Sequence, residues 1–232
     1  PDIVRQARED RLFLGRVVRY LAGEAGIRQF LDIGTGLPTA DNTHQVAQLV
    51  ALECKIVYVG NDPLVLAHAR ALLTSTPEGT TDYIHADMHD PANIVAGAAR
   101  TLDFGQPIAI TMLGVLWHVM DNDEAHAIVS RLVQAMPSGS YLALNHPALE
   151  VTGEKMATAI RYWNEYGTPP GTHRTPGELA RVLRRHGPGR ARRGLDHTPA
   201  ARGHDFGRAR RDRPVRRRRS QAMIRHQPLN TP

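Results

Sequence analysis

The residues with the clearest chemical meaning are 30–38, Phe-Leu-Asp-Ile-Gly-Thr-Gly-Leu-Pro, where an apolar run ends in an acid and a glycine turn. Gly34 and Gly36 permit positive φ and let a ligand approach the backbone, and Asp32 places a carboxylate at the end of a short strand. A dinucleotide fingerprint needs a third glycine where Thr39 stands, and Asp32 would repel a phosphate. The turn therefore predicts a small ligand that carries a cation. The alternative is a tight turn with a capping acid.

Three more groups of residues follow predicted strands within a few positions. They are Gly60, Asn61 and Asp62 after the second strand, Asp87 and Met88 after the third, and Leu113, Gly114, Trp117 and His118 after the fourth. An acid beside glycines binds an ammonium group, polar groups after the second strand bind ribose hydroxyls, and an acid after the third accepts a hydrogen bond from the adenine amine. Together these groups predict S-adenosylmethionine as the ligand.

The elements that position these groups alternate between strand and helix patterns. The predicted strands are 30–33, 55–59, 81–85, 107–113 and 140–144, and the predicted helices are 3–24, one starting at Asn42 or Thr43, one starting at Pro63, 92–100, 123–136 and 156–166. Such alternation with short connections predicts an α/β fold with a Rossmann-like doubly wound, mostly parallel sheet, whose ligands bind at the carboxyl ends of the strands.

Charge divides the chain into two parts. Residues 1–180 hold 13 Lys and Arg against 20 Asp and Glu, a net charge of −7, whereas residues 181–232 hold 16 against 3, a net charge of +13. The basic segment has almost no aliphatic periodicity and is unsuited to form a core. We therefore expect a globular domain over 1–183 and a disordered, basic C-terminal tail over 184–232.

Three interpretations of this tail are open. Clustered arginines neutralise phosphates, so the tail is a candidate arm for nucleic acid. Arg, Gly, Pro and Ala are also the residues that GC-rich DNA encodes in many reading frames, so an out-of-frame translation of a lost C-terminus is the favoured interpretation. A disordered terminus of another kind is the third.

Composition narrows the cellular context. The sequence has no apolar run of membrane-spanning length and no signal peptide, and its lone Cys54 has no partner for an internal disulfide. A cytoplasmic location and a buried, unreactive Cys54 are therefore expected. The histidines show no zinc spacing, so no metal site is expected.

At this point the chain resembles the class I, Rossmann-like methyltransferases, and more closely the actinobacterial DUF574-type S-adenosyl methyltransferases. The resemblance covers about residues 5–183, and the segments that carry it are 30–39, 57–70, 86–91 and 174–180. It implies that Asp32, Gly34, Thr35 and Gly36 hold the amino acid portion of the cofactor, Asn61 and Asp62 the ribose, and Asp87 with Met88 the adenine.

The chain departs from the family pattern in three places. Gly60 stands where the family has a ribose-binding acid, a segment that precedes residue 1 in the family is absent, and the expected strands after Ala180 are replaced by the basic tail. Loss of a charge-assisted ribose contact costs about 1.5–3 kcal/mol. The departures predict a truncated or impaired copy, with an unpaired strand at the sheet edge.

His118 is the candidate general base, because an imidazole near neutrality takes a proton from an oxygen or nitrogen acceptor. The alternative is a packing histidine at a helix start. The expected partner is a small-molecule methyl acceptor. A non-catalytic nucleotide- or adenosine-binding protein whose tail contacts nucleic acid is the main alternative. An NAD(P)-linked oxidoreductase is disfavoured by Thr39 and by the lack of a Tyr-x-x-x-Lys set.

Overall fold

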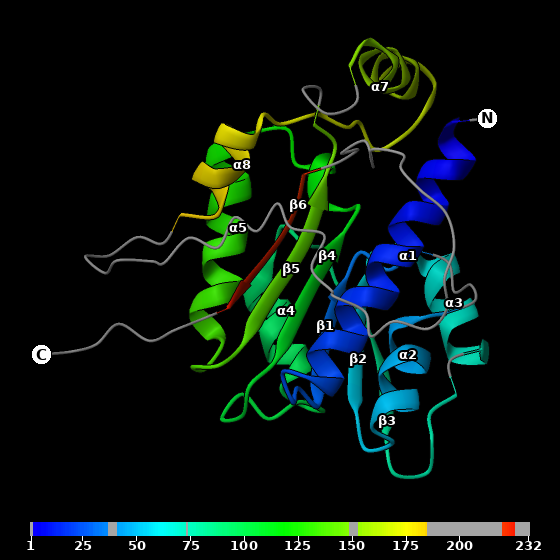
Figure 1. The fold of residues 1–232 in the computed structure, drawn as a ribbon, viewed down its shortest axis with the longest axis vertical. Coiled ribbons are helices and arrows are strands. Elements are labelled where there is room, and N and C mark those ends of the chain that lie inside the picture. Colours follow the sequence, from blue (N-terminus) through cyan, green and yellow to red (C-terminus); the bar gives the residue numbers. More distant parts are fainter. Residues whose placement is uncertain (1, 37–40, 73, 149–152, 185–219, 226–232) are drawn as a thin grey trace, which may run out of the picture.

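The computed structural model of the protein describes residues 2–36, 41–72, 74–148, 153–184 and 220–225. Within these residues, six strands form one sheet in the order β3-β2-β1-β4-β5-β6 (Figure 1). The strands are β1 (Gln29–Ile33), β2 (Lys55–Gly60), β3 (Thr80–His85), β4 (Ala109–Leu113), β5 (Tyr141–His146) and β6 (Ser220–Arg225). The first five are parallel and β6 is antiparallel to β5. The predicted doubly wound, mostly parallel sheet is confirmed.

The strand order reverses between β1 and β4. Phe30 of β1 is paired with Ile56 on one side and with Ala109 on the other. In open α/β sheets this reversal opens a crevice at the carboxyl ends of the strands, where ligands bind. The loops that carry the predicted site residues therefore start on either side of the reversal.

Helices cover both faces of the sheet (Figure 1). The helical elements are α1 (Asp2–Gly23), α2 (Thr43–Val50), α3 (Pro63–Leu72), α4 (Pro91–Ala98), the 3-10 helix η1 (Leu116–His118), α5 (Asn122–Ala135), α7 (Glu154–Tyr166) and α8 (Pro176–Val182). One core cluster joins α1 and α2 to the sheet, and a second joins α4, α5 and α8 to the opposite face. The strands β1, β2, β4 and β5 are consequently buried along most of their length and largely apolar on both faces, as parallel strands are, whereas the edge strand β3 is mostly half-buried.

Local signals set several helix starts. The main-chain N–H of Asn42 donates to Gln45 Oε1 at 2.8 Å just before α2, as in a capping box, and the helix begins at Thr43, one of the two predicted starts. Proline begins α3, α4 and α8, where its missing N–H leaves no hydrogen bond unmade. The observed bounds of the predicted helices and strands differ from the expected ones by a few residues.

The strand β6 is the main difference from expectation. It lies inside the segment predicted to be disordered and pairs with β5 from Tyr141↔Arg225 to His146↔Ser220, so this side of β5 is not the unpaired edge that we expected. An edge strand offers a row of unpaired backbone groups, and Ser220–Ile224 is an uncharged run within the basic segment that can satisfy them. Residues 185–219 and 226–232 lie outside the described residues, so the domain boundary at 183/184 and the interpretations of the tail stay predictions.

Candidate functional site

The glycine turn after β1 has the backbone geometry that its sequence predicts. Gly34 has φ +79° and its N–H donates to the Val59 carbonyl at 2.9 Å. A Cβ at this position would overlap the Val115 side chain, so only glycine fits between the loops after β1 and β4. Gly36 also has positive φ, +62°, but a Cβ there would meet no atom of the described residues within 4 Å. The main chain at Gly36, next to half-buried Thr35, is therefore open to a ligand.

Asp32 lies beneath this turn and is only 5% exposed. Thr43, the first residue of α2, donates its hydroxyl to Asp32 Oδ2 at 2.6 Å, and Thr111 of β4 donates to Oδ1 at 2.8 Å. Burial raises the pKa of the Asp32 carboxyl, although the two threonine hydroxyls and the positive charge of Arg11 oppose the rise. Asp32 thus joins β1, α2 and β4 under the turn. Its predicted contact with the ammonium group of a ligand stays a prediction.

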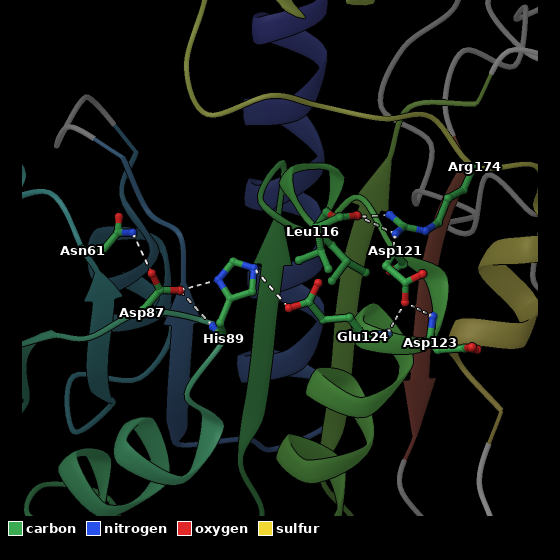
Figure 2. A network of polar contacts seen from close by, with 9 residues as sticks. Asn61, Asp87, His89, Leu116, Asp121, Asp123, Glu124 and Arg174 are labelled. Atoms are coloured by element: carbon green, nitrogen blue, oxygen red, sulfur yellow. Dashed lines mark hydrogen bonds and ion pairs between the residues drawn. The ribbon is translucent and has the colours of Figure 1, made fainter.

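The polar residues after β2 and β3 meet over the sheet edge (Figure 2). Asn61 Nδ2 donates to Asp87 Oδ2 at 3.2 Å, and both the main-chain N–H and ring Nδ1 of His89 lie within hydrogen-bond reach of Asp87 Oδ1, at 2.9 and 2.6 Å. Partial burial alone would raise the pKa of Asp87, but the hydrogen bonds from His89 and Asn61 outweigh it and hold that pKa below its ordinary value. Asp87 is therefore an ionised, exposed acceptor at the carboxyl end of β3.

His89 extends this network across to α5. Its Nε2 lies 3.9 Å from Glu124 Oε1, the distance of an ion pair when the imidazole is protonated (Figure 2). The sequence placed no function on His89. Its position two residues after Asp87 is that of the residue whose main-chain N–H donates to an aspartate side chain in an Asx turn.

Two of the predicted residues also have structural partners. Asp62 Oδ1 accepts a hydrogen bond from Leu64 N at 2.8 Å and so caps the start of α3. Met88 is half-buried and packs against the core cluster on the α4 and α5 face. Both remain next to Asp87 and Asn61 in the chain, and their contacts with ribose and adenine stay predictions.

Tyr83 of β3 is a residue that the sequence did not single out. Its hydroxyl oxygen is buried and has no hydrogen-bond partner among the described residues. A Cβ added to Gly60 would overlap that same hydroxyl, so the Tyr83 hydroxyl fills the space that a side chain at the end of β2 would occupy. The signal in the sequence is the combination of a glycine at the end of β2 with a long polar side chain two residues before the end of the neighbouring strand.

His118 lies in η1, after β4. Its Nδ1 is 2.9 Å from the Pro170 carbonyl oxygen, and because a carbonyl only accepts, Nδ1 carries the proton. Nε2 of the neutral ring then has a free lone pair. The ring packs beside two indoles, with its centroid 4.5 Å from that of Trp117 and 6.2 Å from that of Trp163. The same side chain therefore has both the packing role and the tautomer that a general base requires.

Arg174 holds the loop that carries His118. It is 1% exposed, and it donates to the carbonyls of Leu116 at 3.2 Å and Val119 at 2.6 Å (Figure 2 shows the bond to Leu116). It also donates to His146 Nε2 at 2.7 Å, so His146 is a buried neutral acceptor that belongs to this network. The described residues contain no group of three or more His, Cys, Asp or Glu side chains suited to a metal ion.

Residues 1–187 match the family model of the S-adenosyl methyltransferases. The chain belongs to this family. A DUF574 family protein from Streptomyces avermitilis, known from a crystal structure, is 45% identical over 75% of this chain and 67% of its own, with a TM-score of 0.72. A Thermobifida fusca protein assigned as a methyltransferase is 34% identical over 97% of this chain and 82% of its own, with a TM-score of 0.77.

More distant methyltransferases share the fold alone. The mitomycin 7-O-methyltransferase MmcR has a TM-score of 0.53 at 19% identity, over 75% of this chain and 46% of its own. No curated protein matches the chain. The family match makes the protein an S-adenosylmethionine-dependent methyltransferase and favours this function over a non-catalytic nucleotide-binding protein or an NAD(P)-linked oxidoreductase.

The residues of the crevice fit this cofactor. At the carboxyl edge of the sheet the main chain at Gly36 is open and Asp87 is an ionised acceptor. The Tyr83 hydroxyl there has no hydrogen-bond partner among the residues that the structure describes. No helix among the described residues is long and apolar enough to cross a membrane.

Proposed function

We propose that this methyltransferase acts on a small-molecule acceptor and holds its cofactor along the carboxyl ends of β1, β2 and β3. Asp32, Gly34, Thr35 and Gly36 hold the amino acid portion. Asn61 and Asp62 hold the ribose, and Asp87 with Met88 holds the adenine. The hydrogen-bonded chain of Asn61, Asp87 and His89 supports this assignment, because it orients an ionised acceptor at the exposed end of β3.

S-adenosylmethionine supplies an activated methyl group when it is bound. The protein then contributes mainly by orienting the acceptor in line with that group and by excluding water. His118 Nε2 takes the proton from an oxygen or nitrogen acceptor, because the Pro170 carbonyl fixes the proton of the ring on Nδ1. Arg174 positions His118 by holding both ends of η1.

The observation that carries the choice of a small acceptor is the packing of the segment after α7 against η1, beside His118. The segment after α7 is bonded onto η1 at two points: Thr172 N donates to the Trp117 carbonyl at 2.8 Å, and His118 donates to Pro170. Trp163 of α7 closes the cluster, with its ring centroid 5.6 Å from that of Trp117. We infer that this half-buried aromatic cluster beside His118 admits a small molecule more easily than a folded macromolecule. The net charge of −7 on residues 1–180 also disfavours a nucleic acid.

The test is the destination of the methyl group. The protein is incubated with S-adenosylmethionine that carries a tritiated methyl and with a cell extract divided into low-mass, protein and nucleic-acid fractions. We expect label in the low-mass fraction. Label confined to protein or nucleic acid contradicts a small-molecule acceptor.

The role of His118 is tested with His118→Gln. We expect methyl transfer to fall by about a hundredfold, the contribution typical of a general base, while the affinity for S-adenosylhomocysteine is unchanged. Transfer at the wild-type rate would leave His118 only its packing role.

Gly60 limits the cofactor affinity of this chain. A carboxylate at the end of β2 would accept charge-assisted hydrogen bonds from the ribose, and Gly60 offers none. We therefore expect weaker cofactor binding than in a relative that has an acid there, by about ten- to a hundredfold. We therefore propose that this chain is an impaired copy in its affinity for the cofactor.

A further inference from the structure

The end of β2 lacks the side chain that usually recognises a ribose. In Rossmann-type folds an acid at this place accepts hydrogen bonds from the sugar hydroxyls. Here the last residue of β2 is Gly60, and it is half-buried at the crevice. The contact that an acid at this place makes with the ribose is therefore missing, unless another group beside Asn61 and Asp62 supplies it.

The neighbouring strand fills the vacant space. Gly60 is paired with His85 of β3, and Tyr83, two residues earlier, is paired with Tyr58. Side chains in a strand lean along the strand, so the Tyr83 phenol extends toward the carboxyl edge. Its hydroxyl ends where a Gly60 Cβ would lie.

This hydroxyl is not engaged in a hydrogen bond within the described part of the chain. It is buried and finds no partner among the described residues, which is unfavourable for a polar atom. Burial and the negative charge of Asp62 raise the pKa of Tyr83, so the hydroxyl stays protonated and both donates and accepts. Tyr83 as a whole is half-buried, its hydroxyl lies over Gly60, and the two residues that follow Gly60, Asn61 and Asp62, are exposed.

We propose that the Tyr83 hydroxyl binds the ribose together with Asn61 and Asp62, and that it takes the place of the acid that Gly60 lacks at the end of β2. The inference rests on the proposed placement of the cofactor at this edge of the sheet. It assigns Gly60 a role as well, because any larger residue there would displace the hydroxyl. A neutral hydroxyl binds the ribose less strongly than a carboxylate but retains selectivity for a sugar hydroxyl.

The experiment compares ligands that differ only at the sugar. S-adenosylhomocysteine and its 2′-deoxy and 3′-deoxy analogues are titrated calorimetrically into the full chain, wild type and Tyr83→Phe. We expect the wild type to prefer S-adenosylhomocysteine to at least one deoxy analogue. Tyr83→Phe weakens S-adenosylhomocysteine binding by about 3- to 10-fold and removes that preference, without lowering the melting temperature.

Tyr58→Phe is the matched control. It removes a phenol hydroxyl from the adjacent strand, but that hydroxyl is 2.8 Å from His44 N, which donates to it. We expect this variant to melt at a lower temperature and to keep the preference for the ribose. Gly60→Ala supplies a second test, because its Cβ displaces the Tyr83 hydroxyl and should remove the preference as Tyr83→Phe does.

The outcomes separate this inference from the proposed function. If wild type binds S-adenosylhomocysteine and Tyr83→Phe binds it equally well, or loses affinity equally for all three ligands, the ribose role is overturned and the cofactor site stands. If folded wild type does not bind S-adenosylhomocysteine, both are overturned.

Discussion

The carboxylate of Asp32 is placed where its charge opposes folding. It is buried between β1, α2 and β4, and two threonine hydroxyls satisfy only part of its hydrogen-bonding capacity. A raised pKa in the folded state means that the folded protein binds a proton more tightly than the unfolded chain does.

The sign of the pH dependence follows. Between the ordinary pKa of an aspartate and the raised one, the folded state holds a proton that the unfolded chain has lost, so stability falls as pH rises through this window, by at most about 1.4 kcal/mol per pH unit. We expect the free energy of unfolding of the wild type, measured in urea relative to Asp32→Asn, to fall from pH 4 upward and then to level off. A difference that rises with pH would contradict a raised pKa.

Arg174 is the second residue whose burial makes a prediction. Its guanidinium donates to main-chain carbonyls of the η1 loop and to Asn122 Oδ1 at 2.7 Å. Lysine has three donors at a single point and cannot span these acceptors. We expect Arg174→Lys to lower the free energy of unfolding by about 3 kcal/mol, because buried carbonyls lose their donors.

The matched control for that change is Arg161→Lys. Arg161 is exposed and lies 3.5 Å from Glu154, so the same substitution there should change stability by less than about 0.5 kcal/mol. Urea unfolding measures the free energy of unfolding of both variants, and we expect the slope of that free energy against urea concentration to be unchanged. Equal effects of the two substitutions would contradict the network around Arg174.

At the scale of elements, β6 closes one edge of the sheet. Its backbone pairs with all of β5, so its removal exposes the hydrogen-bonding groups of Tyr141–His146. We expect a chain that ends at 219 to show faster amide exchange in β5 and a tendency to self-associate, measured by hydrogen exchange and light scattering. A chain that ends at 225 keeps β6 and is the control. Equal exchange in the two chains would contradict the pairing.

The alternating elements could be predicted from the sequence because their apolar periods are strong. Buried runs such as 55–59 and the amphipathic pattern of 123–136 locate β2 and α5 directly. The η1 turn and α8 are too short to show a period, and β6 interrupts a basic segment whose composition predicts no strand. Its position depends on a partner strand far away in the sequence.

For the candidate site, too, the sequence predicts the positions of residues but not their contacts. Asn61, Asp87 and His118 could be placed at the strand ends, since each follows a predicted strand by a few residues. Their bonds could not be predicted, because Asp87 is oriented by His89, and His118 by Pro170, through loop geometry. The Tyr83 hydroxyl over Gly60 depends on the register of β3 against β2, which a single sequence does not specify.

Over the whole molecule, the part of the chain that carries the cofactor site and the C-terminal basic segment have net charges of opposite sign. Residues 1–180 carry a net charge of −7 and residues 181–232 a net charge of +13. Cofactor binding releases few counterions, whereas nucleic-acid binding through clustered arginines releases many. We expect the affinity for S-adenosylhomocysteine to change by less than about twofold between 50 and 200 mM salt. Any binding of DNA should weaken steeply over the same range, and a steep loss of cofactor affinity would contradict a cofactor site separate from the basic segment.

The central claim is that the cofactor binds at the carboxyl edge of the sheet against Asp87. The most direct measurement is calorimetric titration of S-adenosylhomocysteine into wild type, Asp87→Ala and Asp103→Ala. Asp103 lies before β4, and its Oδ1 accepts a hydrogen bond from Gly105 N at 2.8 Å, much as Asp87 accepts one from a main-chain N–H. Asp103→Ala therefore controls for the loss of an acid. We predict binding by the wild type and by Asp103→Ala, and a loss of about tenfold or more in Asp87→Ala. Equal binding by all three proteins, or none by folded wild type, would contradict the claim.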